Sequence, residues 1–147
     1  MAVIVSETID APIDQVFAVS TDIPSAAEFI SGISGIEMLS DGPVGQGTKW
    51  RETRTMFGRE ASETMWIAEW NPPERYVVEA RSRGMRYSTP ITLESLTDGR
   101  TTITMSFEAT PESFMAKIMM KVFSGMTQHV RTALQQDLTD LKAHCES

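Results

Sequence analysis

Two charged residues, Glu52 and Arg54, lie two positions apart, a spacing that can place both side chains on the inner face of a β-sheet. The segment 48–57 alternates as a β-strand does, and its apolar residues Trp50 and Met56 share their parity with this pair. Because a lone buried charge is costly, an inward-facing carboxylate and guanidinium must pair with each other or bind something. One interpretation is that they orient a polar group of a guest molecule, or that Glu52 acts as a general acid or base.

A structural interpretation of the same pair is also open. Glu52 and Arg54 can form an internal ion pair, or a twisted sheet edge can carry both side chains to solvent at the mouth of a cavity. A β-bulge reverses the parity of the residues after it, so alternation alone does not choose between these interpretations.

Two tyrosines on other predicted strands, Tyr76 and Tyr87, are candidates for polar contacts in an apolar pocket. Tyr87 shares its parity with Ile91 and Leu93, and Tyr76 shares its parity with Val78. A hydroxyl group among apolar side chains is a common way for a small-molecule site to fix its ligand. The alternative is a tyrosine that packs in the core with its hydroxyl at the rim.

The two histidines and the single cysteine do not form a recognisable catalytic or metal site. His129 and His144 lie fifteen residues apart, which is about 22 Å along a helix, so they cannot share one coordination sphere. His129 adjoins an apolar stripe and is interpreted either as touching a cavity or as a satisfied or exposed side chain. Cys145 is predicted to lie at a frayed surface, and no Gly-x-Ser-x-Gly motif is present. We therefore predict no metal and no cofactor.

The elements that position these residues are organised around the stretch 111–145. Apolar residues recur there at steps of three and four, which predicts one long amphipathic helix with Thr110 as its cap and Pro111 at its first position. Gly125 predicts a kink. Methionine is a deformable packing residue, so the half before Gly125 is predicted to cover a cavity while the second half packs firmly. The methionines that crowd the first half are Met115, Met119, Met120 and Met126.

Almost everything before that helix alternates like β-structure. A predicted strand at 2–9 is followed by two short helices and then by a meander of strands. In the segment 60–70 both parities contain apolar residues, and we favour Met65 and Ile67 as the inward pair. The strands of the meander are predicted at 36–39, 48–57, 60–70, 75–83, 85–96 and 100–109.

Particular residues stand beside these elements in a specific order. They are Thr8-Ile9-Asp10-Ala11-Pro12, Val16-Phe17, Asp22, Gly45 and Gly47, Gly58-Arg59, Asn71-Pro72-Pro73-Glu74-Arg75, Asp98-Gly99-Arg100-Thr101, Leu141-Lys142 and Glu146. In this order and spacing the chain resembles the polyketide cyclase/dehydrase-like family of the START-like superfamily (SRPBCC), which also contains the birch-pollen-allergen fold. The resemblance implies an α+β helix-grip fold, in which a curved seven-stranded antiparallel sheet wraps a long C-terminal helix, with two short helices between strands 1 and 2. It also implies a cavity between sheet and helix for lipids, polyketides, hormones or other apolar molecules, and some members of the family are cyclases.

Composition limits the other classes of function. A chain of 147 residues is predicted to form one START-like domain over residues 1–147. The net charge of -7 argues against nucleic acid as a partner, and no apolar run is long enough to span a membrane. One cysteine and the absence of a signal-like amino terminus predict a cytoplasmic location. The oligomeric state is left open, with a homodimer among the alternatives.

Three hypotheses for function follow, and the sequence leaves open whether the protein is an enzyme. The first is binding of a hydrophobic or amphipathic small molecule, such as a lipid or a polyketide-like compound. The second is a polyketide cyclase or dehydratase that uses Glu52 or Tyr87 as acid or base. The third is a protein-interaction module without a ligand. The predicted ligand-binding residues are Trp50, Glu52, Arg54, Met56, Met65, Tyr87, Met105, Met119, Val122, Phe123 and Met126.

Overall fold

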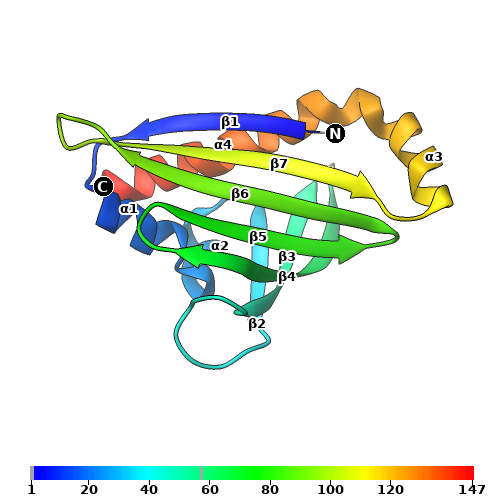
Figure 1. Ribbon diagram of the computed structural model, residues 1–147, viewed down its shortest axis with the longest axis horizontal. Helices are drawn as coiled ribbons and strands as arrows, with labels where there is room; N and C mark the ends of the chain where they lie inside the picture. Colours follow the sequence, from blue (N-terminus) through cyan, green and yellow to red (C-terminus); the bar gives the residue numbers. More distant parts are fainter. Residues whose placement is uncertain (1, 57) are drawn as a thin grey trace.

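One antiparallel sheet forms most of the molecule (Figure 1). The computed structural model describes residues 2–56 and 58–147, without the side chains of Met56, Val122, Phe123 and Ser124. Within these residues seven strands pair in the order β1-β7-β6-β5-β4-β3-β2, so that consecutive strands from β2 to β7 are neighbours and β1 joins the edge beside β7. The strands are β1 (Ala2–Ile9), β2 (Ile33–Met38), β3 (Lys49–Met56), β4 (Arg59–Asn71), β5 (Arg75–Ser82), β6 (Met85–Ser95) and β7 (Thr101–Pro111).

Short helices and one long helix complete the fold. The connection from β1 to β2 contains α1 (Ile13–Ser20), η1 (Ile23–Ser25) and α2 (Ala26–Phe29), and the chain ends with α3 (Phe114–Phe123), η2 (Ser124–Met126) and α4 (Thr127–Cys145). The long helix α4 runs along the sheet and packs against β1, α1 and α2. This is the helix-grip arrangement, an α+β fold with a long C-terminal helix held by a curved sheet.

Alternation along the strands puts one face of the sheet into the core. In β1 the side chains of Val3, Val5 and Ile9 are buried while the residues between them are exposed or half-buried. The main core joins this face to the inner side of α4 and to α1, through Leu138, Leu141 and other buried residues. The apolar stripe of α4 therefore packs as its spacing of three and four predicts.

A β-bulge explains why the parity of β4 looked ambiguous. The register against β5 shifts between Ile67 and Glu69. Before the bulge Ile67 is buried and Met65 lines the interior, as predicted; after it Trp70 also turns inward, and its ring centroid lies 5.1 Å from that of Phe17. The extra residue reverses the alternation. Residues of one parity therefore face inward before the bulge, and residues of the other parity face inward after it.

The carboxy-terminal segment differs from its prediction at its start. Thr110 and Pro111 pair with β6 and belong to β7, so the prediction of a helix beginning at Pro111 with Thr110 as its cap is wrong. The helix begins instead at Phe114, where the Ser113 hydroxyl accepts a hydrogen bond from the Ala116 N–H at 3.1 Å. The predicted kink at Gly125 is confirmed, because the η2 turn there separates α3 from α4. Figure 1 shows α3 beyond the end of the sheet, where β7 stops.

Candidate functional site

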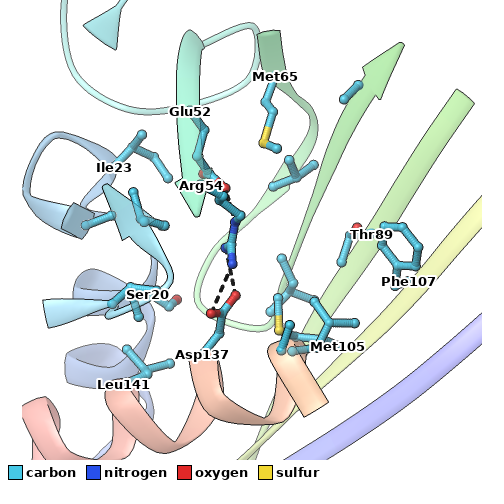
Figure 2. A pocket seen from close by; sticks show the side chains of 18 of the residues that line it. Ser20, Ile23, Glu52, Arg54, Met65, Thr89, Met105, Phe107, Asp137 and Leu141 are labelled. Atoms are coloured by element: carbon cyan, nitrogen blue, oxygen red, sulfur yellow. Dashed lines mark hydrogen bonds and ion pairs between the residues drawn. The ribbon is translucent and has the colours of Figure 1, made fainter. Parts of the chain in front are cut away.

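A cavity of about 330 Å³ lies between the inner face of the sheet and α4. Its wall is mostly apolar and comes from strands β2 to β7, from the short helices and from α4. Figure 2 shows that the side chains of Met65, Met105, Phe107 and Leu141 contribute to this wall. Other apolar lining residues are Ile23, Ile30, Ile33, Val78, Ile91, Ile103, Val130, Leu134 and Leu138.

Three charged side chains meet at one side of the cavity. The Arg54 guanidinium donates from Nε to Glu52 Oε2 at 2.7 Å, and from its two terminal nitrogens to Asp137 Oδ1 and Oδ2 at 3.2 and 2.7 Å. Figure 2 shows the bidentate pair between Arg54 on β3 and Asp137 on α4. The indole N–H of Trp50 donates to Glu52 Oε1 at 3.3 Å. This group connects the sheet to the helix across the cavity wall.

The local structure explains how the three charges come together. Glu52 and Arg54 lie two residues apart on β3, so both side chains leave the same face of the strand. Asp137 lies three residues after Leu134 and four before Leu141, on the inner face of α4. Gly32 provides the necessary space, because a Cβ there would stand 3.2 Å from a terminal nitrogen of Arg54.

Burial and pairing decide the charge states of this group. Glu52 and Asp137 are only 8% and 7% exposed. Burial raises the pKa of Asp137 above its ordinary value, although the neighbouring Arg54 guanidinium opposes the shift. Burial alone would lower the pKa of Arg54, but Asp137 and Glu52 together hold it above the ordinary value. The guanidinium is therefore a permanent cation, and Asp137 is the carboxyl group for which ionisation is made harder by its surroundings.

The two tyrosines occupy different environments. Tyr76 is 4% exposed, its hydroxyl donates to the Ser20 carbonyl at 3.2 Å, and burial raises its pKa to about 12. Tyr87 is half-buried and stacks on Phe107 with ring centroids 5.8 Å apart. Burial and then the charge of Glu63 raise the pKa of Tyr87, against the influence of Arg83. Both phenols are thus neutral near pH 7 and can donate a hydrogen bond but not act as phenolate bases.

Most of the predicted ligand-binding residues with described side chains line the cavity. These are Trp50, Glu52, Arg54, Met65, Tyr87 and Met105. Met119 is 48% exposed on α3, and neither it nor Met126 lines the cavity. The predictions for Met56, Val122 and Phe123 fall outside the described side chains. That any of these residues binds a ligand stays a prediction.

The prediction that the methionine-rich half of the helix covers the cavity is wrong for the described residues. The helical wall is provided by α4, through Val130, Ala133, Leu134 and residues further along it. In α3, Phe114 and Met115 are 75% and 68% exposed. The physical reason is the η2 turn, which directs α3 away from the sheet and leaves the inner face to the leucines of α4.

Sequence reasoning missed Asp137 and Gly32. The signal for Asp137 was available, because an aspartate inside the apolar stripe, between Leu134 and Leu141, must be paired when the stripe is buried. No comparable signal marked Gly32, since its role depends on an approach between segments far apart in the chain.

The histidines and Cys145 lie away from the cavity wall. His129 is exposed, and the ring of His144 stacks on Phe29 with centroids 4.3 Å apart. The prediction that Cys145 lies at a frayed surface is wrong, because it is 5% exposed in the main core, where burial raises its pKa. Among the described residues no cluster of three or more His, Cys, Asp or Glu side chains is suited to a metal ion. No helix in the same part of the chain has the length and apolarity to cross a membrane.

The arrangement combines an apolar cavity with polar groups gathered in its wall. A guanidinium carries five N–H donors, and the bonds to Glu52 and Asp137 use three of them. Arg54 therefore retains donors for a carbonyl oxygen of a guest, while the two carboxylates fix its position.

Comparison with known proteins agrees with this architecture. The sequence profile of the family described as "Polyketide cyclase / dehydrase and lipid transport" matches residues 1–146. The chain belongs to this family. The polyketide cyclase/dehydrase family is the one that the sequence resemblance indicated, and the match extends over nearly the whole chain. No sequence among curated proteins matches it.

Solved structures share the fold of this family member at low sequence identity. The protein TTHA0849 from Thermus thermophilus has a TM-score of 0.82 at 14% identity, over 99% of this chain and 97% of the other. The Zhui aromatase/cyclase from Streptomyces sp. R1128 has a TM-score of 0.79 at 16% identity, over 99% and 93%. Ara h 8.0201 has a TM-score of 0.68 at 16% identity, over 99% and 97%. At such identities the likeness establishes the fold alone.

Proposed function

We propose that the protein binds a hydrophobic or amphipathic small molecule, lipid-like or polyketide-like, in the cavity between the sheet and α4. The observation that carries the proposal is the cavity itself. Its volume of about 330 Å³ falls at the lower end of the range of roughly 300–1,000 Å³ for small-molecule sites. Its wall is apolar apart from a few gathered polar groups, which is the usual composition of such a site.

A pair of matched variants on α4 tests the binding proposal. Ala133 lines the cavity, whereas Ala143 is exposed on the same helix. Ala133→Phe is expected to fill part of the cavity and weaken binding of the neutral fluorescent probe N-phenyl-1-naphthylamine by at least about tenfold, while Ala143→Phe leaves it unchanged. Equal binding by both variants, with the fold intact by circular dichroism, would show that the probe does not occupy this cavity.

A second candidate function is cyclisation or dehydration of a polyketide-type substrate. The observation in its favour is the group of Glu52, Arg54 and Asp137, in which a fixed cation can polarise a carbonyl group beside a buried carboxyl group of raised pKa. Native mass spectrometry of the purified protein would identify a bound compound. That compound would then be incubated with wild-type protein, Glu52→Gln and Tyr87→Phe.

The outcome distinguishes an enzyme from a carrier. An enzyme is expected to convert the compound to a cyclised isomer of equal mass, or to a product lighter by one water if dehydration follows, and the variants are expected to slow that conversion. Unchanged compound with all three proteins would support binding alone. A protein that carries no compound and binds no apolar probe would instead support the third hypothesis, a protein-interaction module.

A further inference from the structure

We propose that the cavity selects a ligand whose polar end is an uncharged or cationic hydrogen-bond donor, such as a hydroxyl or an amine, and that Glu63 contacts this end and disfavours carboxylates. The inference rests on the proposed binding function and adds the chemical class of the ligand. The site is the apolar cavity already described, and the inference concerns the charges in its wall.

Carboxyl groups outnumber guanidinium groups on the cavity face. The charged side chains that face the cavity are Glu52, Arg54, Glu63 and Asp137, which are three carboxyl groups against one guanidinium. A further lining residue, Glu79, lies by strand alternation on the other face of β5, where its carboxylate accepts from Arg86 at 3.0 Å. Burial raises the pKa of Asp137, but even without the charge of Asp137 the two glutamates outnumber the single guanidinium, so the cavity face is acidic.

The positive charge of Arg54 in the cavity wall is already compensated by two carboxyl groups. Arg54 makes contacts of 2.7 Å with both Glu52 and Asp137, and the contact with Asp137 is bidentate. Its positive charge is thus shared between two carboxylates. A ligand carboxylate would have to compete with both of them in a poorly hydrated site, whereas a neutral carbonyl oxygen would need only a spare N–H donor.

Glu63 is a second glutamate on the sheet side of the cavity. In the β3–β4 register Glu63 stands directly opposite Glu52, so two like charges share the cavity face. Like charges at directly opposed positions destabilise a sheet. Glu52 is paired with Arg54, but no ion pair to Glu63 is found within residues 2–56 and 58–147. Glu63 is half-buried and lines the cavity, so it is an acceptor that a ligand can reach.

The surroundings of Glu63 place it beside a second polar group. Glu63 and Tyr87 both line the cavity, and burial and then the charge of Glu63 raise the pKa of Tyr87. Arg83 acts to lower the pKa of the same hydroxyl, but the Arg83 side chain is exposed. Arg59, at the start of β4, is exposed as well. A hydroxyl or ammonium group at this position would donate to Glu63 and relieve its repulsion from Glu52. A carboxylate there would add a negative charge beside those of Glu63 and Glu52.

A matched series of ten-carbon compounds tests the selectivity. Decylamine, decanol and decanoate would compete with N-phenyl-1-naphthylamine at pH 7.5 in 0.15 M salt. We expect decylamine and decanol to displace the probe at least about tenfold more effectively than decanoate, which corresponds to about 1.4 kcal/mol. Equal competition by decanoate and decanol would overturn the inference. Failure of the probe itself to bind would instead contradict the proposed binding function.

Two substitutions on β4 isolate the role of Glu63. Glu63→Gln is expected to reduce the discrimination against decanoate to within about threefold, and Glu63→Lys to reverse it. Glu60→Gln is the control, because Glu60 is exposed on the other face of the same strand and its substitution changes the net charge equally. Equal effects of Glu60→Gln and Glu63→Gln would attribute the selectivity to overall charge and overturn the assignment of Glu63.

Discussion

At the scale of single residues, the group around Arg54 determines how the cavity wall is held. The guanidinium connects Glu52 on β3 with Asp137 on α4, and both carboxylates are largely removed from water. Such a group is compatible with a stable fold only while all of its charged members are present. If one partner is removed, the other charges remain buried without compensation, whereas replacing the whole group with apolar or neutral residues removes the need for compensation.

Arg54→Ala is expected to lower the free energy of unfolding by about 3–5 kcal/mol, because it leaves two buried carboxylates unpaired. The triple variant Glu52→Gln, Arg54→Met, Asp137→Asn is expected to recover most of that loss. Arg51→Ala, on the exposed face of the same strand, is the control and is expected to change stability by less than about 0.5 kcal/mol. Urea unfolding measures all three. A loss for Arg54→Ala no larger than that of the control would contradict this account.

Tyr76 gives a prediction for alkaline pH. Its pKa is about 12 in the folded protein and about 10 when unfolded, so the folded state keeps a proton that the unfolded state loses. The associated stability is present below pH 10 and is lost as the pH rises from about 10 to 12, and it amounts to about 2–3 kcal/mol. The free energy of unfolding, followed by urea titration from pH 9 to 11, should fall more steeply for wild type than for Tyr76→Phe. Equal slopes would show that the phenol is not shielded as described.

At the scale of elements, α3 and α4 have different roles although one amphipathic pattern runs through both. The inner face of α4 lines the cavity and packs in the core, while Phe114, Met115 and Ile118 of α3 are exposed. The separation depends on the η2 turn at Ser124–Met126. The pattern of apolar residues predicted that a helix forms, but the partner of each half depends on the direction that the chain takes after β7.

Alanine substitutions in the two helices measure this difference. Leu138 is 2% exposed and Met119 is 48% exposed. Leu138→Ala is expected to cost about 2–5 kcal/mol because it leaves a cavity in the core, and Met119→Ala less than about 0.5 kcal/mol. Chemical unfolding monitored by circular dichroism gives both values. A large loss for Met119→Ala would mean that α3 packs against the body of the protein.

At the scale of the whole molecule, contacts at the middle and at the end of α4 hold this helix against the sheet with which it lines the cavity. Lys142 in the last turn of α4 donates to the Thr8 carbonyl of β1 at 2.9 Å. Just beyond the ends of these two elements, the Asp10 N–H donates to Glu146 at 2.8 Å. The Arg54–Asp137 pair fastens the middle of the helix to β3. The cavity is lined partly by core side chains, so a ligand there would be bound only by the folded state.

Ligand binding should therefore raise the free energy of unfolding. A ligand present at a hundred times its dissociation constant is expected to raise the free energy of unfolding by about 2.7 kcal/mol. Thermal unfolding with and without decanol measures the effect, which should be smaller in Ala133→Phe, because its phenyl ring occupies the cavity. A shift that is equal in wild type and in Ala133→Phe would place the ligand elsewhere.

The residues alone predicted the order of the elements, the buried faces of most strands and the shared parity of Glu52 and Arg54, because these depend on local periodicity and on turn residues. It also indicated the family, through residues that mark the turns and ends of elements. The folded structure was needed to establish that Glu52 and Arg54 face the cavity, that Asp137 completes their charged group with space left by Gly32, and that α4 rather than α3 forms the helical wall. These features depend on contacts between segments far apart in the chain and on the direction of α3 after the sheet ends, and neither is encoded in the spacing of residues along one element.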